Sequence, residues 1–595
     1  MKKRILSFID FDVKRSTRLI SLCIFIGIIA GLGAIIFQLL CDAGMHYLMD
    51  MLAGYRPGGP KGEISIFHPT NTPFNRWILL ILPSIGGFIS GFLVYTFAPE
   101  AEGHGTDAAI EAYHKKGGLI RPQVPIVKTI ASAITLTSGG SGGREGPIAQ
   151  IGAGVGSFIA TKLKLSPTER RILMVAGIGA GVGSIFRAPF AGALFAAEVL
   201  YRDPDVEPEV LIPAGISSIV AYCVFCLFFG FGTLFDSPTY VFKNLLELAP
   251  YTILAIILSG TAYLYVKCFY KVHDTFVFLS IPHVIKPAIG GLSTGIIGFF
   301  IPQTLGFGYG VLQDALYNQV SIKYLLAVAF GKILTTSFSI GSGGSGGVFG
   351  PSIVIGGCLG GAIGQFFHDI MPGIITDPHA MVILGMAGFF SAVSNAPIST
   401  IIFVSEMTNS YELLLPSFLV CLLCYIFSKD ISIYIEQVKN RAASPAHAGE
   451  FFHDILKSYY VEDLKHEIRS VQVVPENMTF NEFKMFFSNT EQQYFPVVNN
   501  KGEFVGIFSS TDIRGILFED LGPLILIKDI ATSHVITTNF KEDLHTVMKK
   551  FTQKNIDSIP VVDYRTPKRL IGMLRRREAI AFYNKKVEEI TRESK

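Results

Sequence analysis

Apolar runs alternate with short polar stretches through the first three quarters of the chain. Two early runs, roughly Leu19–Leu40 and Trp77–Phe97, each have the length of about 20 residues that one helix needs to cross a bilayer. Later runs are shorter and are broken by glycine, at Ile126–Leu136, Met174–Ile185 and Pro189–Leu200. Helices this short are tolerated at membrane depth only where protein or a water-filled cavity surrounds them. The pattern therefore predicts an all-α polytopic membrane domain with broken helices.

Composition agrees with this prediction and argues against other classes of protein. Apolar residues make up 50% of the 595 positions, charged residues only 16%, and there are 60 glycines. The formal charge of +3 is too balanced for a nucleic-acid binder, so we expect no nucleic-acid partner. Basic residues from Lys2 to Arg18 precede the first apolar run, which places residues 1–18 in the cytoplasm by the positive-inside rule.

A glycine-rich stretch occurs twice in the apolar region. Ser138–Gly152 reads SGGSGGREGPIAQIG and Ser342–Gly356 reads SGGSGGVFGPSIVIG, an offset of 204 from 138 to 342. Glycine lets backbone N–H groups turn toward one point, and proline suits the first turn of a helix. Because a helix N-terminus also carries partial positive charge, each copy predicts an anion site built from backbone amides.

A second motif repeats at nearly the same spacing. Arg187–Glu198 (RAPFAGALFAAE) reappears as Asn395–Glu406 (NAPISTIIFVSE). Two halves with broken helices at matching places indicate a transporter-type binding site near the membrane midplane. We expect a membrane domain over residues 19–440, with halves at about 19–205 and 206–440 that have opposite orientations.

These motifs resemble a known family. Gly143–Pro147 (GREGP), Gly347–Pro351 (GVFGP) and Tyr434 are similar to motifs of the CLC family of chloride channels and proton/chloride antiporters. The likeness extends from about Leu19 to the end of the chain. It implies a homodimer in the lipid bilayer, with one chloride pathway per subunit and no enzymatic activity.

The resemblance also implies roles for individual residues. Glu145 would be the gate, because the glutamate of the first motif in that family competes with the anion for one site. The implied anion-binding residues are His104, Gly143, Arg144, Gly146, Gly347, Val348, Phe349, Gly350 and Tyr434. The chemistry of Glu145 supports its role independently, since a carboxylate at a helix N-terminus and a chloride ion seek the same amide dipoles. The alternative is a structural cap that pairs with Arg144.

The chain departs from the family at His104. Many members have a serine in this turn, where Gly103–Asp107 here reads GHGTD. A neutral imidazole donates one hydrogen bond, and a protonated one adds a charge near neutral pH. Chloride remains the expected anion, with bicarbonate or fluoride as alternatives, and a His104 that is turned away and bonded to backbone is the structural alternative. Thr106 or Asp107 is expected to cap the helix that follows.

A second departure concerns proton coupling. Proton-exchanging members commonly carry an internal glutamate just after the acid that matches Glu198, and Val199 occupies this position here. Valine cannot relay a proton, which favours a passive, voltage- or pH-gated channel over the alternative of a proton/chloride antiporter. Glu198 and its counterpart Glu406 are expected to tie helix ends together at a contact between halves or subunits.

One enzyme class shares part of the pattern. Gly139–Gly143 (GGSGG) formally matches the nucleophile elbow of a serine hydrolase. Its copy around Ser345 lies in the same glycine context, and no histidine with an acid partner recurs at a matching position. Because one nucleophile needs one base, duplication favours packing or ion binding, and an intramembrane hydrolase stays a remote alternative.

The last part of the chain has a different pattern. A polar linker is predicted at 441–465, followed by short strands and amphipathic helices in which Tyr494–Asp512 parallels Ser558–Glu578. This duplication resembles a pair of cystathionine-β-synthase (CBS) domains, predicted at 466–522 and 523–585. The tail is expected to be a cytoplasmic α/β module, so that both termini lie in the cytoplasm.

The CBS resemblance implies a regulatory ligand. In such pairs a serine or threonine three residues before an aspartate commonly holds an adenosine ribose, a spacing kept by Ser509 and Asp512. The second copy has Arg575 and Glu578 instead, so at most one site fits. We expect binding of ATP, ADP or AMP at Ser509 and Asp512 to bias the gate, with no required cofactor and no metal. A purely structural dimerisation module is the alternative.

Overall fold

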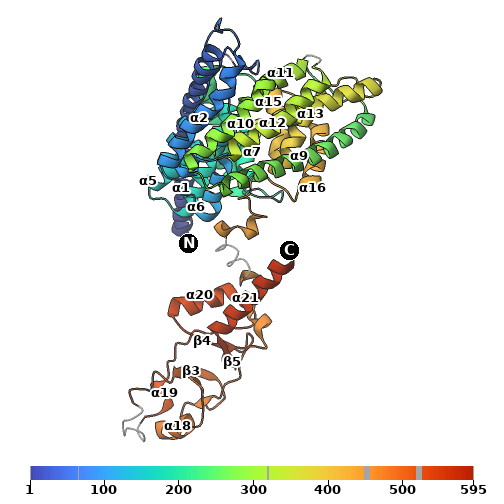
Figure 1. Ribbon diagram of the computed structural model, residues 1–595. Helices are drawn as coiled ribbons and strands as arrows, with labels where there is room; N and C mark the ends of the chain where they lie inside the picture. The colour runs from blue at the N-terminus through green and yellow to red at the C-terminus, as the bar shows by residue number, and fades with distance from the viewer. Residues whose placement is uncertain (1, 64–65, 318–319, 448–455, 517–524, 594–595) are drawn as a thin grey trace. The chain divides into compact units, whose positions relative to one another are not determined.

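The computed structural model describes residues 2–63, 66–317, 320–447, 456–516 and 525–593. It divides into two compact units, Met1–Ala446 and His447–Lys595 (Figure 1). Part of the predicted linker, residues 448–455, lies outside the described residues.

The first unit consists of α-helices in two sets of eight that follow the same order of long and short helices. The first set is α1 (Lys2–Gly44), α2 (Arg76–Phe97), α3 (Thr106–Lys115), α4 (Gln123–Thr137), α5 (Glu145–Lys162), α6 (Pro167–Ile185), α7 (Pro189–Glu198) and α8 (Pro208–Phe229). The second set is α9 (Leu248–Phe278), α10 (Lys286–Phe300), α11 (Tyr309–Tyr317), α12 (Ile322–Gly341), α13 (Phe349–Ile370), α14 (Ala380–Ser394), α15 (Pro397–Thr408) and α16 (Leu414–Ser428).

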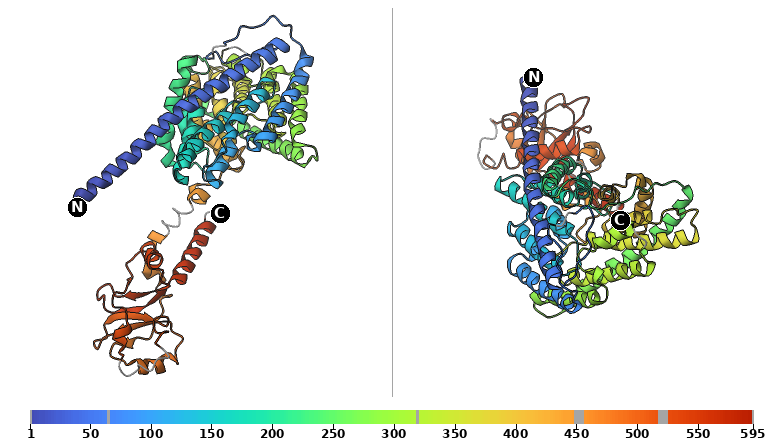
Figure 2. Two further views of the ribbon diagram at one scale, coloured as in Figure 1. Left: turned by 90° about the vertical axis from the view of Figure 1, so that its left-hand side faces the viewer. Right: turned by 90° about the horizontal axis from the view of Figure 1, so that it is seen from above.

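Short π-helical and 3-10 segments extend or connect these helices. A π-helical segment, η1 (Met45–Leu52), extends α1, which runs along the whole first unit (Figure 2). The 3-10 turns are η2 (Pro99–Ala101), η3 (Leu245–Glu247), η4 (His283–Ile285), η5 (Pro302–Thr304), η6 (Tyr411–Leu413), η7 (Arg441–Ala443), η8 (Pro445–His447) and, in the second unit, η9 (Val461–Leu464). In the described part of the chain, eight helical spans are long and apolar enough to cross a membrane. The prediction of an all-α polytopic membrane domain is therefore confirmed.

Four helices are too short to cross a bilayer. They are α3 and α7 with 10 residues each, α11 with 9 and α15 with 12. Pro189 and Pro397 occupy the first helical positions of α7 and α15, where the missing proline N–H costs nothing. Of the three short segments that the apolar pattern predicted, Pro189–Leu200 corresponds to α7, Ile126–Leu136 lies in the 15-residue α4, and Met174–Ile185 is the end of α6, which has 19 residues because it begins at Pro167. The four short helices lie at the same places in the two halves.

The repeat extends to single side chains that the sequence analysis did not select. Lys128 on α4 donates its Nζ to the carbonyls of Ala101 and Gly103, at 3.0 and 2.7 Å. Lys332 on α12 donates its Nζ to the carbonyls of Thr304 and Gly306, at 3.1 and 2.6 Å. Each lysine is fully buried and binds the unwound turn that precedes a short helix, α3 in one half and α11 in the other.

The unwound turns themselves depend on glycine. In the first half Gly103 and Gly105 have φ of +67° and +82°, and in the second half Gly306 and Gly308 have +57° and +82°. Such left-handed positions favour glycine because it has no Cβ. The residue before α3 is therefore Gly105, and the predicted caps Thr106 and Asp107 are instead its first helical residues. This correction reflects a turn that only glycine can make.

The halves meet at their glycine-rich turns. Gly143 and Gly347 form an antiparallel bridge, each donating its N–H to the other's carbonyl at 2.7 Å. Since α5 begins at Glu145 and α13 at Phe349, the N-termini of two matching helices face one another. This arrangement agrees with the predicted opposite orientation of the two halves. From the eight-helix match we propose that the boundary between the halves follows α8 rather than residue 205.

The second unit contains two small sheets. β1 (Val474–Pro475) is parallel to β2 (Tyr494–Val498), β2 is antiparallel to β3 (Phe504–Ser509), and β4 (Ser558–Val562) is antiparallel to β5 (Leu570–Arg575). Its helices are α18 (Phe480–Phe487), α19 (Ile527–Ile530), α20 (Leu544–Lys554) and α21 (Arg576–Glu593). Both hairpins shift register at the same place, between Val497 and Val498 and between Val561 and Val562. The predicted α/β duplication is confirmed.

Candidate anion site at the paired glycine turns

Glu145 lies where the two halves meet. It is the first residue of α5 and is only 4% exposed. One carboxylate oxygen, Oε1, accepts a hydrogen bond from the Tyr309 hydroxyl, and the other accepts one from the Gly350 backbone N–H at 3.2 Å. The carboxylate of the first half thus occupies one donor at the start of α11 and one at the start of α13, both in the second half. An entering anion would need those same donors.

The predicted amide donors divide into two groups. The N–H groups of Gly143 and Gly347 form the hydrogen bonds of the bridge between the halves, so their role is structural. Gly146, Val348 and Phe349 lie at or just before the first turns of α5 and α13, where a helix offers no internal acceptor for its N–H groups. These amides, together with that of Gly350, are the donors that an anion could use.

His104 and Tyr434 lie beside these turns. The rings of His104 and Tyr434 are 5.4 Å apart, both side chains are buried, and Tyr434 also interacts with the Thr106 side chain. His104 Nε2 is 3.5 Å from Asp107 Oδ2, and Nδ1 has no hydrogen-bond partner among the described residues. The backbone carbonyl of His104 lies against Gly146, where a Cβ would collide with it. The two predicted side chains therefore come together next to the start of α5.

Arg144 points away from the carboxylate that follows it. Its guanidinium donates from Nη1 to Gln38 Oε1 and from Nη2 to Glu63 Oε1, the latter at 2.5 Å. The group lies over the rings of Phe307 and Tyr309, with 5.0 and 5.5 Å from Cζ to the ring centroids. Arg144 therefore pairs with Glu63, and the alternative in which it pairs with Glu145 does not match this geometry.

Aromatic rings fix the start of α13. The Phe349 ring packs against Phe390, with centroids 4.1 Å apart, and also against Phe186, Phe195 and Phe403. These rings come from both halves. Because Phe349 opens α13, the cluster holds in place the amides that face Glu145.

Tyr309 is the functional residue that the sequence analysis missed. Its hydroxyl binds Glu145, it is 1% exposed, and it begins α11. The signal was present, because GFGY at 306–309 repeats the GHGT of 103–106. Tyr309 is thus the counterpart of Thr106, and each half places a hydroxyl at the start of its short helix.

Val199 lies at the C-terminal end of α7, where it is buried and its carbonyl accepts a hydrogen bond from Gln437. The preceding residue, Glu198, accepts from the N–H groups of Ile398 and Ser399 at the start of α15. Glu406, at the other end of α15, accepts from the N–H of Ala191 at the start of α7. The two acids cap each other's helices across the halves, in agreement with their expected structural role.

The serines of the nucleophile-elbow pattern are packing residues. Ser141 Oγ lies 2.9 Å from the Thr336 hydroxyl, and Ser345 Oγ donates to the carbonyl of Ala101. Both serines are fully buried. Their contacts give no support to the hydrolase alternative, which requires a base next to the nucleophile.

In the second unit, the predicted ribose-binding pair is engaged in its own turn. Asp512 Oδ2 accepts from the Ser509 N–H and hydroxyl, at 2.7 and 2.9 Å. Glu578 does the same for the Arg575 N–H at 3.2 Å. A cavity of about 410 Å³ is lined by residues of both copies, Gln493 and Tyr494 from the first and Asp557, Ser558, Arg575, Arg576, Arg577 and Ile580 from the second. Its arginines can meet phosphate groups.

Comparisons with known proteins agree with this arrangement. The model of the family described as voltage gated chloride channel matches residues 86–429, and that of the CBS domain matches residues 461–519 and 527–585. A putative ClcB-like chloride channel protein of Ralstonia nicotianae is 29% identical over 59% of this chain and 82% of its own length. An H(+)/Cl(-) exchange transporter ClcA of Vibrio campbellii is 30% identical over 66% of this chain and 82% of its own. The solved structure of a slow cyanobacterial Cl⁻/H⁺ antiporter covers 69% of this chain and 94% of its own, at 25% identity and a TM-score of 0.61.

Proposed function

The chain belongs to the voltage gated chloride channel (CLC) family and carries a C-terminal pair of CBS domains, and on that premise we propose that it conducts chloride passively through a pathway gated by Glu145. As a member of this family it is an integral membrane protein that transports anions. The proposal concerns the gate, the mode of transport and the regulation of this protein.

The position of the Glu145 carboxylate supports this function most directly. It accepts from the Gly350 N–H at the start of α13, next to amides that α13 does not use internally. A protonated carboxyl group no longer carries the charge that attracts these dipoles, so the side chain can leave and chloride can take its place. Chloride then lies among backbone amides, with Tyr434 and His104 close by.

Proton-coupled exchange is the second candidate, because two of the similar proteins carry that activity in their names. Val199 argues against it in this chain. Its side chain has no group that binds a proton, and it occupies the position at which exchangers of the family commonly carry their internal glutamate.

A reversal-potential measurement separates the two candidates. The purified protein is reconstituted in planar bilayers with a chloride gradient, and a pH gradient is then added. We expect the reversal potential to follow the Nernst potential of chloride at every pH gradient. A shift of the reversal potential with the pH gradient identifies an exchanger and contradicts the channel proposal.

The proposal includes an orientation. With the basic residues of the N-terminus in the cytoplasm, the end of α1 and the loop that follows it lie outside the cell. After Ser428 the chain continues to the second unit, which lies in the cytoplasm in this orientation.

We also propose that the protein is a homodimer. Short helices in a membrane require protein around them, yet α7 and α15 leave Phe190 and Ile398 58% and 43% exposed. The neighbouring helices expose further apolar side chains, such as Ile219 on α8 and Phe418 on α16. A second copy of the chain would cover this surface.

A further inference from the structure

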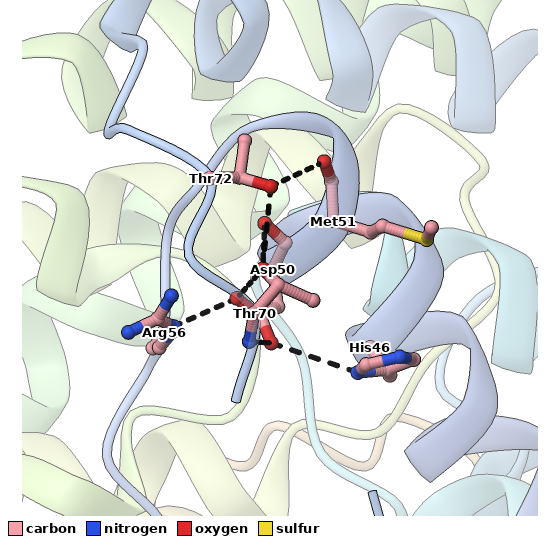
Figure 3. Close-up of polar contacts among 6 residues, drawn as sticks. All are labelled: His46, Asp50, Met51, Arg56, Thr70 and Thr72. Atoms are coloured by element: carbon pink, nitrogen blue, oxygen red, sulfur yellow. Dashed lines mark hydrogen bonds and ion pairs between the residues drawn. The ribbon is translucent and has the colours of Figure 1, made fainter. Parts of the chain in front are cut away.

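The loop between α1 and α2 crosses the membrane unit as a strap. We use this name for residues 55–72, of which 64–65 lie outside the described residues. Both ends of the strap are tied to Asp50 in η1 (Figure 3). Arg56 Nε and the Thr70 hydroxyl each donate to Asp50 Oδ1 at 2.7 Å, and the Thr70 N–H donates to Oδ2 at 3.0 Å. One carboxylate therefore holds both ends of the strap.

The middle of the strap is tied to the other half. The Lys61 N–H donates to Gln313 Oε1 on α11 at 3.0 Å, and the Gly62 N–H donates to the carbonyl of Leu234 at 3.1 Å. Gly58 touches the backbone of Gly310, so closely that a side chain at Gly58 would press on it. The strap therefore spans from η1 to the first turns of α11.

A cavity of about 280 Å³ lies under the strap. Tyr309, which holds Glu145, forms part of its wall, so the cavity reaches the neighbourhood of the gate. The charged and titratable residues that line it are Asp42, His46, Asp50, Arg56, Glu63, Arg187 and Tyr309. In the proposed orientation this cavity is the outer vestibule of the pathway.

Glu63 brings a carboxylate from the strap to the gate motif. Its Oε1 lies 2.5 Å from Arg144 Nη2, and its side chain is 26% exposed whereas that of Arg144 is 1% exposed. Glu63 is the acid that forms an ion pair with Arg144 within the described part of the chain. A guanidinium buried at membrane depth needs such a counter-charge. Arg144 also keeps an open donor, because its buried Nε has no partner among the described residues.

We propose that the Arg144 guanidinium is an additional anion-binding site at the outer end of the pathway, and that Glu63 occupies it as a tethered competitor. The site would take chloride or another small monovalent anion of similar size. This inference rests on the proposed anion pathway. A carboxylate held on an anchored loop acts at a millimolar effective concentration, so an external anion must displace it before moving on to Glu145.

The site differs from the one occupied by Glu145 in its donors. There the anion meets backbone amides at a helix N-terminus, and here it meets a side-chain cation that the cavity reaches once Glu63 moves. Arg187 also lines the cavity, with one guanidinium nitrogen 3.2 Å from the carbonyl of Phe229, and adds positive charge to the route. An anion would therefore pass from one fixed positive group to the next.

Bromide, which scatters anomalously, locates the site directly. Crystals of the full-length protein are soaked at low bromide concentration, for the wild type and for Glu63→Gln, which removes the charge and keeps the shape. We expect an anomalous peak at the Arg144 guanidinium in Glu63→Gln and none in the wild type. At saturating bromide the wild type should show the same peak, with Glu63 displaced.

Asp42→Asn is the matched control. Asp42 lines the same cavity and accepts from Gln38 Nε2 at 2.8 Å, so this variant changes the cavity charge equally and removes no direct contact of Arg144, whose Nη1 donates to the other end of the Gln38 amide. It should leave the Arg144 site empty at low bromide. An equal peak in Asp42→Asn overturns the proposal in favour of a general effect of charge. A missing peak in Glu63→Gln, or in the wild type at saturation where the variant does not fold, also overturns it.

The central anion site of the proposed function is tested by a different anomalous peak. In Glu145→Gln, bromide should lie at the amides of Val348 and Phe349, whatever happens at Arg144. A bromide peak at the amides of Val348 and Phe349 without a peak at Arg144 refutes only the outer site. A peak at Arg144 without a peak at those amides refutes only the central site. In flux assays, Glu63→Gln should lower the half-saturating external chloride concentration about tenfold, while Asp42→Asn changes it less than twofold.

Discussion

At the scale of single residues, the proposed gate role of Glu145 predicts that anion flux depends on the charge of this side chain and not on its size. Its carboxylate lies on the Gly350 N–H and the Tyr309 hydroxyl, where chloride is expected to bind. Acid should therefore raise anion flux in the wild type, because protonation removes the competing charge.

Glu145→Gln tests this directly. Glutamine has the same shape without the charge, so chloride efflux from liposomes should be high and nearly independent of pH. Glu111→Gln, at a partly exposed position of α3 where the side chain pairs with Lys116, is the control that should keep the pH response of the wild type. A Glu145→Gln protein whose flux still rises in acid contradicts the assignment of the gate.

The Tyr309 hydroxyl should set how readily the gate opens. It donates to the carboxylate and so favours the charged, seated form of Glu145. Tyr309→Phe removes only this donor. We expect the pH at which flux is half-maximal to move upward, since the carboxyl group then takes up a proton more easily.

A matched control for Tyr309→Phe is Tyr240→Phe, which removes another buried tyrosine hydroxyl, bound to the Leu316 carbonyl. A merely structural loss would affect both variants alike. If the pH profile of Tyr309→Phe coincides with that of the wild type, the hydroxyl does not hold the gate.

Residue-scale predictions from the sequence succeeded where the signal was local. The repeated glycine turns and the acid at a helix start can each be recognised from a few consecutive residues. For this reason the sequence correctly predicted that Glu145 lies at the start of a helix. The partner of Glu145 was missed because Tyr309 comes from the other half, and no local pattern states which side chain reaches across. The direction of Arg144 was missed for the same reason, since Gln38 and Glu63 lie far away in sequence.

At the scale of elements, the two buried lysines explain how the unwound turns stay in place. Lys332 binds the carbonyls of Thr304 and Gly306, whose other donors are the Thr335 hydroxyl at 3.2 Å and the Gly142 N–H at 3.3 Å. Each hydrogen bond of this kind contributes about 0.5–1.5 kcal/mol to stability. The turn leads directly into α11 and therefore fixes Tyr309.

Lys332→Met should therefore lower the melting temperature of the protein. It should also weaken the hydrogen bond from Tyr309 to Glu145, because the turn that fixes Tyr309 is less firmly held. Methionine fills a similar volume but donates no hydrogen bond. Lys323→Met on the same helix changes an exposed side chain and should leave the melting temperature nearly unchanged. Thermal unfolding in detergent, followed by size-exclusion chromatography, measures both variants. Equal melting temperatures for the two variants would show that the buried lysine is dispensable.

Element boundaries show why part of the fold escaped the sequence. The apolar runs located the helices, but their ends depend on turns, as at Gly105, which precedes α3 in place of the predicted cap. The strap is a further case. Its composition, rich in proline and glycine, indicates a loop, but its position also follows from the contact between Lys61 and Gln313, which are 252 residues apart in the sequence.

At the scale of the whole molecule, regulation by the second unit depends on whether it binds a nucleotide. Ser509 and Asp512 bond to each other, whereas Arg576 and its neighbours line a cavity. We therefore expect adenine nucleotides to bind through their phosphates at the arginines. Calorimetry on the full-length protein with ATP should give a heat that Arg576→Ala abolishes and Asp512→Ala reduces less. Absence of heat in the wild type would leave a structural module.

The dimer is the largest-scale prediction, and it follows from helices that do not cross the membrane. A short helix cannot cross the bilayer by itself and is tolerated at membrane depth only where protein surrounds it. The exposed Phe190 and Ile398 on α7 and α15 therefore need a protein neighbour. Ile398→Trp adds bulk on that surface and should yield monomers in light scattering of the detergent-solubilised protein. Ile81→Trp, on the long helix α2 where Ile81 is 52% exposed, should remain dimeric because lipid adapts to the added ring. Since the residues around Glu145 all come from one chain, the monomer should still conduct chloride, and a monomer without flux would mean that the pathway needs both subunits.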